Sequence, residues 1–61
     1  MMRDLNKEIE VVESIIEVLN KCLAIHKQEN HHRQVLSCLD DINICKKELQ
    51  RLIEERKMML I

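Results

Sequence analysis

The sequence predicts an all-α fold, an antiparallel two-helix hairpin, and three observations support this prediction. The 61 residues include no Gly, Pro, Phe, Trp or Tyr, so the residues most typical of tight turns and strands are absent. Apolar residues recur at three- and four-residue spacing in both halves of the chain, as they do along one side of a helix. A polar run, KQENHHRQ at 27–34, separates the halves and is where the chain is expected to turn.

The first half, about 4–29, has the pattern of a helix with a wide apolar surface. One row follows a heptad spacing and is expected to face the second helix: Leu5, Ile9, Val12, Ile16, Leu19 and Leu23. A second row runs beside it: Val11, Ile15, Val18, Cys22 and Ile25. At ~100° per residue the two rows together span roughly 160°, which is wider than one neighbouring helix covers. We therefore expect this helix to have two neighbours, and Asp4 to be its N-cap.

The second half, about 33–59, has a narrower apolar stripe on a mostly charged helix. The stripe consists of Val35, Cys38, Ile42, Cys45, Leu49 and Leu52, widened by Leu39 and Ile53. When the heptad frame of the first half is continued past Leu23, it falls mostly on polar residues, so the two stripes are out of phase. The phase break favours a turn at about 30–32, and Asn30 suits it because Asn tolerates a positive φ. The missing Gly keeps a single bent or continuous helix as the alternative.

Folding the chain at this turn places residues side by side when their numbers add to about 62. The expected apolar neighbours are Ile9 with Leu52 or Ile53, Val12 with Leu49, Ile16 with Cys45, and Leu23 with Leu39. The expected charged neighbours are Glu10 with Arg51 and Glu17 with Lys46. Apolar residues thus meet apolar residues, and the acidic first half meets the basic end of the second, so the predicted core comprises the first helix's heptad row with Val35, Ile42, Leu49 and Leu52.

The sequence carries no motif that predicts catalysis, a cofactor or a small-molecule substrate. Cys22, His26 and Cys38, with His31 or His32 from the turn, include the residue types that bind zinc. They lack the paired spacing of known zinc sites, and each cysteine lies in an apolar stripe where a thiol acts as a small hydrophobe. We therefore expect no metal, no cofactor and no enzymatic activity.

Charge and cysteine content narrow the remaining classes of partner and compartment. The formal net charge of −1 argues against binding nucleic acid, which calls for a basic surplus. No apolar run approaches the ~20 residues of a membrane span, and four glutamates on the first helix argue against a lipid surface. Three cysteines without disulfide spacing predict an intracellular protein, cytoplasmic or nuclear. The lack of Gly and Pro also suggests a segment of a longer protein.

The surplus apolar surface predicts a protein interface. We expect it to comprise Val11, Ile15, Val18, Cys22, Ile25, Leu39 and Ile53. The leading hypothesis is an antiparallel four-helix homodimer that brings together two copies of a larger intracellular protein. The alternative is a hairpin that binds a different protein: a small GTPase, an adaptor or a partner helix. The predicted architecture resembles small plasmid-encoded RNA-binding proteins and short hairpins that bind Rab-type GTPases, in helix length and loop placement.

Overall fold

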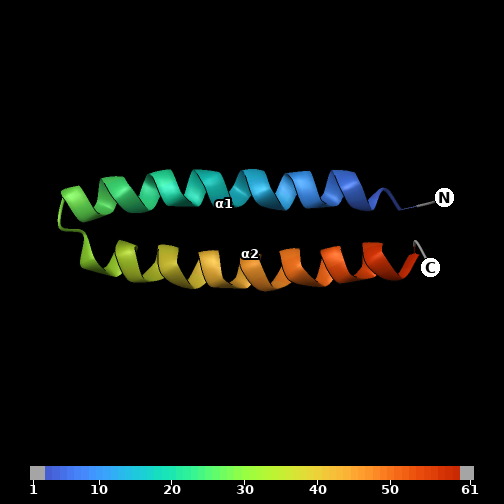
Figure 1. Cartoon of the computed structure of the whole chain (residues 1–61). Helices are drawn as coiled ribbons and strands as arrows, with labels where there is room; N and C mark the ends of the chain where they lie inside the picture. Colours follow the sequence, from blue (N-terminus) through green and yellow to red (C-terminus); the bar gives the residue numbers. More distant parts are fainter. Residues whose placement is uncertain (1–2, 60–61) are drawn as a thin grey trace.

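The computed structural model describes residues 3–59, which form two helices packed side by side. Helix α1 spans Leu5–Gln28 and helix α2 spans His32–Met59. The helices run in opposite directions, so that the turn lies at one end of the molecule and both termini lie at the other (Figure 1). The predicted helical hairpin is confirmed, and the alternative of one continuous helix is wrong.

Helix α1 begins with the N-cap that the sequence predicted. The side chain of Asp4 accepts a hydrogen bond of 3.1 Å from the backbone N–H of Lys7. This bond satisfies one of the amide groups that the first turn of a helix leaves without a partner. Glu8 lies in the same turn, where a carboxylate interacts favourably with the positive end of the helix dipole.

The turn between the helices is built on Asn30, as predicted, with φ of 61°. The N–H of His31 donates to the carbonyl of His26 at 2.9 Å, and the N–H of Asn30 donates to Lys27 at 3.3 Å. These two bonds form the Schellman arrangement that commonly ends a helix at a residue in the left-handed region. Asn therefore takes the place that Gly usually has, which explains how a chain without Gly makes the turn.

The core lies along the seam between the two helices. Leu5, Ile9 and Leu52 are buried together, with Val12, Leu49 and Ile53 packed against them. The predicted neighbours Ile9 and Leu52, and Val12 and Leu49, thus belong to the same cluster. Nearer the turn, Cys38 and Ile42 are also buried. The other residues assigned to the core are only half-buried: Val12, Ile16, Leu19, Leu23, Val35 and Leu49. Two helices cannot enclose a side chain on all sides, so most of the seam stays partly open.

The charged residues do not pair across the seam as expected. The guanidinium of Arg51 binds Glu48 and Glu55 of its own helix, the latter at 2.6 Å, and not Glu10. Glu17 likewise pairs with Lys21, one turn along α1, at 3.6 Å. Side chains three or four residues apart on one helix meet without crossing the apolar seam, which is why the local pairs form.

Two polar contacts do connect the helices near the termini. Arg3 lies 3.0 Å from the carboxylate of Glu55, and Arg56 donates to the side-chain oxygen of Asn6 at 3.0 Å. The second contact joins residues whose numbers add to 62 and so shows which levels of α1 and α2 lie beside each other.

Candidate interaction surface

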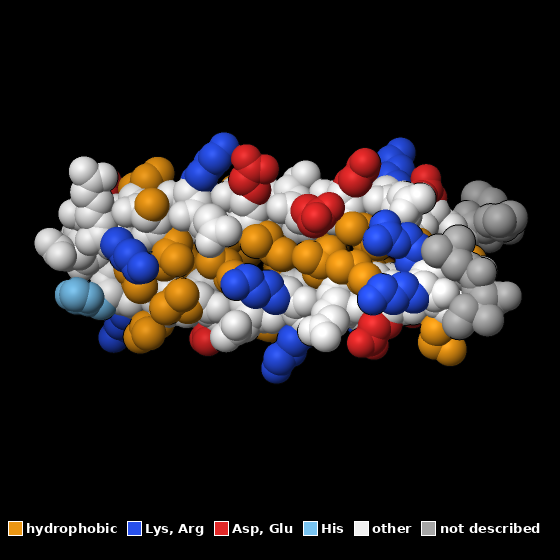
Figure 2. Space-filling model, viewed as in Figure 1, with side chains coloured by type: hydrophobic (Ala, Val, Ile, Leu, Met, Phe, Trp, Pro, Cys, Tyr) orange, Lys and Arg blue, Asp and Glu red, His pale blue; other side chains and the backbone are white. Residues whose placement is uncertain are grey.

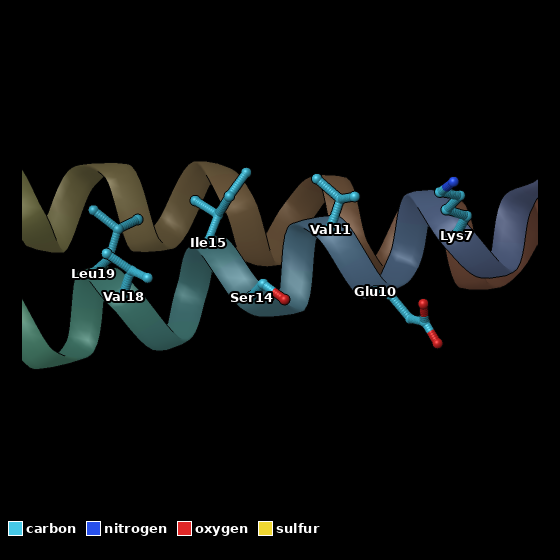
Figure 3. Close-up of a pocket in the computed structure, with 7 residues that line it drawn as sticks. All are labelled: Lys7, Glu10, Val11, Ser14, Ile15, Val18 and Leu19. Carbon is cyan, nitrogen blue, oxygen red and sulfur yellow. The ribbon is translucent and has the colours of Figure 1, made fainter.

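The exposed apolar row of α1 is the main feature of the surface. Four aliphatic side chains lie along it with about half of their area exposed: Val11 at 53%, Ile15 at 45%, Val18 at 58% and Ile25 at 52%. Cys22, the fifth member of the row, is half-buried. Figure 3 shows Val11, Ile15 and Leu19 projecting from the same side of α1, with Val18 beside them. We call this side of the hairpin the apolar face.

The apolar face includes an open groove along the first half of α1. Lys7, Glu10 and Ser14 line this groove together with Val11, Ile15, Val18 and Leu19. Glu10 is directed away from the aliphatic side chains in Figure 3, so it forms an outer edge of the groove. The floor of the groove is aliphatic and its polar residues stand at the margins. Such a surface suits the apolar side chains of an amphipathic helix.

The seam separates the apolar face from a second, polar face. Val11 lines a groove together with Glu48 and Leu52, which places this flank of α2 beside the apolar row. On the opposite side of the seam, Glu13, Glu17 and Asn20 line a groove with Lys46 and Leu49. Figure 2 shows one face of the hairpin, where a band of hydrophobic side chains follows the seam and charged side chains flank it on both helices.

The structure divides the predicted interface residues between the two faces. Leu39, Lys46 and Ile53 are seven residues apart and therefore share one side of α2. Since Lys46 lies on the polar face, Leu39 and Ile53 lie there too, away from the row that contains Val11. Leu39 is exposed, whereas Ile53 packs against the hairpin core. The five α1 residues thus form one surface, and the two α2 residues are not part of it.

Charged rows border the apolar face on both sides. On α2, the flank beside the seam carries a heptad-spaced row of Gln34, Asp41, Glu48 and Glu55, which we call the acidic row. On α1, the outer side carries Lys7, Ser14, Lys21 and Gln28 at the same spacing, which we call the basic row; Lys7 also lines the groove beside Glu48. The hydrogen bond from Arg51 lowers the pKa of Glu48 below its usual 4.5, so the carboxylate is charged at neutral pH.

Four exposed apolar residues of α2 lie outside the predicted interface: Leu36, Ile44, Met58 and Met59. Leu36 and Ile44 are more exposed than any member of the α1 row. Neither belongs to an apolar stripe, so periodicity gave no signal for them. Single exposed aliphatic residues are common on protein surfaces and do not by themselves indicate an interface.

The histidines and cysteines considered as metal ligands are dispersed, apart from one pair at the turn. Nδ1 of His26 lies 3.3 Å from Nδ1 of His31, which also contacts a carboxylate oxygen of Glu29 at 3.4 Å. Within residues 3–59, no three His, Cys, Asp or Glu side chains come together in a group that could hold a metal ion. The three thiols are free, and Cys38 is buried in the seam.

Two further observations concern the whole described chain. Neither helix of residues 3–59 combines the length and apolar character needed to cross a membrane. Comparison of the chain with protein-family models, curated proteins and solved structures gave no match.

Proposed function

We propose that the hairpin is a protein–protein interaction module that self-associates through its apolar face, forming a four-helix homodimer. The observation that carries this proposal is the row of four half-exposed aliphatic side chains on one side of α1. A contiguous apolar row bordered by charged residues is typical of surfaces that bind another protein. A two-fold homodimer is the commonest closed assembly, and it lets the same row meet itself.

The size of the row is consistent with a reversible dimer. Complete burial of an aliphatic side chain contributes about 1.5–3 kcal/mol, and roughly half of that remains available at each of the four positions. The row therefore supplies about 3–6 kcal/mol per chain, or about 6–12 kcal/mol for a pair. This gain is comparable to the ~4–15 kcal/mol that association costs, so the row by itself supports a weak, reversible dimer.

The hairpin's small core gives a second reason for association. Only five apolar residues between 3 and 59 are buried: Leu5, Ile9, Cys38, Ile42 and Leu52. A chain of this size usually needs a staple or a partner for comfortable stability. A second copy packed against α1 would complete the burial of the apolar row. If the hairpin is a segment of a larger protein, its self-association would bring two copies of that protein together.

The direct test is the molar mass in solution, measured by sedimentation equilibrium over a hundredfold range of concentration. Interference or peptide absorbance must be used for detection, because the chain has no Trp or Tyr. A mass of two chains of 7.3 kDa supports the proposal. A monomer throughout contradicts it and favours the alternative, in which the apolar face binds a GTPase, an adaptor or a helix of another protein.

A substitution then tests whether the apolar face is the interface. Val18→Glu places a charge in the middle of the row and is expected to dissociate the dimer while much of the helix remains. Leu36→Glu is the matched control, because Leu36 is 64% exposed and lies outside the row. It should leave the molar mass unchanged. If Val18→Glu stays dimeric at micromolar concentration, the interface lies elsewhere.

A further inference from the structure

We infer that the two hairpins associate in parallel, in place of the antiparallel arrangement expected from the sequence, with α1 beside α1 of the second copy and both turns at the same end. This inference rests on the proposed self-association and specifies its geometry. It follows from the charged rows that border the apolar face, and from the positions of their residues along the long axis of the hairpin.

The acidic and basic rows lie on opposite margins of the apolar face. The acidic row belongs to the flank of α2 next to the seam, as Glu48 shows by lining the same groove as Val11. The basic row runs along the outer side of α1, as Ser14 shows by lining the groove with Val18 and not the groove beside Glu48; Lys7, at the end of the row, lines both grooves. Glu10 and Glu17 stand one helical row further out, and Glu10 points away from the aliphatic side chains (Figure 3).

The direction of the second hairpin decides which rows face each other. When two α1 helices are related by a two-fold axis along their length, the α2 helices lie on opposite sides of the pair. Each α2 then stands over the basic margin of the other copy's α1. When the axis is perpendicular to the helices, both α2 helices lie on the same side. The acidic rows then face each other, and so do the basic rows.

The levels along the hairpin make the parallel match specific. The contact between Asn6 and Arg56 places residues at the same level when their numbers add to 62. Glu55 therefore stands level with Lys7, and Asp41 stands level with Lys21. In a parallel pair the second copy's lysines occupy these same levels, so Glu55 and Asp41 each face a lysine of the other chain, whereas Glu48 faces Ser14.

Asp41 is the residue on which the match depends most. Glu48 and Glu55 already bind Arg51, and Glu55 also binds Arg3. Asp41 makes no ion pair within the part of the chain that the structure describes, and the second copy's Lys21, which lies 3.6 Å from Glu17 of its own helix, would provide one. In an antiparallel pair centred on Val18, Asp41 would instead face the acidic row of the second copy, close to the level of its Glu48. Opposed like charges disfavour that arrangement.

Disulfide cross-linking tests the direction of the hairpins. Cysteine is introduced at Val11 or at Ile25 in a chain whose own cysteines are replaced (Cys22→Ser, Cys38→Ala, Cys45→Ser), after circular dichroism has shown that this chain is helical. The two positions are about 21 Å apart along α1. In a parallel pair each position meets its own copy, so both variants should form disulfide-linked dimers on oxidation. In an antiparallel pair at most one of them can do so.

The result that would overturn the inference is cross-linking between the Val11→Cys and Ile25→Cys chains in a mixture, without self-linking of both. The proposed function survives that result, because the unsubstituted chain would still sediment as a dimer. A monomer in sedimentation overturns both proposals. Val18→Cys lies at the middle of the row and serves as the positive control, since it can link in a parallel pair and in an antiparallel pair centred there.

Charge reversal gives an independent test that keeps the natural cysteines. Asp41→Lys turns two attractive contacts into repulsive ones in a parallel dimer, so the dissociation constant should rise by about tenfold. Adding Lys21→Asp should restore binding. Asp40→Lys is the matched control, because it changes the charge equally at the neighbouring position, off the acidic row. If Asp41→Lys tightens the dimer, the hairpins are antiparallel and the inference fails.

Discussion

Truncation of Leu52 is the most informative perturbation of the hairpin itself. Leu52 is 1% exposed and packs in one cluster with Leu5 and Ile9, so it is the most enclosed side chain of the described residues. Leu52→Ala deletes the part of the side chain that joins the two helices near the termini. The cost has two parts: the lost transfer of the deleted atoms out of water, and the cavity that remains.

The expected magnitude follows from how far the surroundings can close over that cavity. Substitutions of this kind in rigid cores cost about 2.7–5 kcal/mol, and the cost falls where neighbours can move in. The seam is open on both faces, since Val12 and Leu49 beside the cluster are half-buried. We therefore expect about 3 kcal/mol, near the lower end. Chains of this length have a free energy of unfolding of about 3–9 kcal/mol, so the loss is a third or more of it.

Urea unfolding followed by circular dichroism at 222 nm measures this loss, with all variants at one chain concentration because association contributes to stability. Leu36→Ala is the matched control, because it deletes the same atoms from a side chain that is 64% exposed. It should cost less than about 0.5 kcal/mol. If the two variants lose the same amount, the helices do not pack along the seam described above, and the reasoning about both faces fails with it.

Two further predictions concern the turn and the charges of α2. Asn30→Ala should cost about 1 kcal/mol of stability, because the φ of 61° at this position suits Asn and Gly but not Ala. Asn30→Gly should be nearly neutral. Equal melting temperatures for the two variants would contradict this account. Arg51→Gln should raise the pKa of Glu48 towards its usual 4.5, because the Arg51 hydrogen bond is the main cause that lowers it. The contribution of this contact to stability is therefore present above pH 4.5 and is lost as the pH falls through the lower pKa of the folded state. Titration of the Glu48 carboxyl carbon by NMR checks the prediction, and an unchanged midpoint in Arg51→Gln would refute it.

The hairpin and its turn could be predicted from the sequence because each depends on local rules. The apolar stripes of the two halves are out of phase, and the break falls in a polar run, so a turn there satisfies both stripes at once. Asn30 is the residue in that run best suited to a positive φ in the absence of Gly. Asp4 precedes the first apolar row, where a capping carboxylate is expected.

The division of the surface into two faces could not be predicted in the same way. Periodicity gives the angle of a residue around its own helix, but not which flank of one helix lies beside which flank of the other. Leu39 and Ile53 were therefore grouped with the row of Val11, although they lie on the polar face with Lys46. The charged pairs expected across the seam failed for a related reason, because Arg51 reaches Glu48 and Glu55 within its own helix.

The distribution of charge argues that the apolar face selects its partner. On the polar face, Glu13 and Glu17 of α1 line a groove with Lys46 of α2, so charges of both signs stand close together. On the apolar face, Asp41, Glu48 and Glu55 border the side next to α2, and Lys7 and Lys21 border the side of α1, with aliphatic side chains between them and Glu10 at the outer edge. A helix that docks there must present a basic edge towards α2 to avoid repulsion. Helix α1 of a second copy has such an edge when it runs in the same direction, which is why the charges favour the parallel dimer over an arbitrary apolar contact.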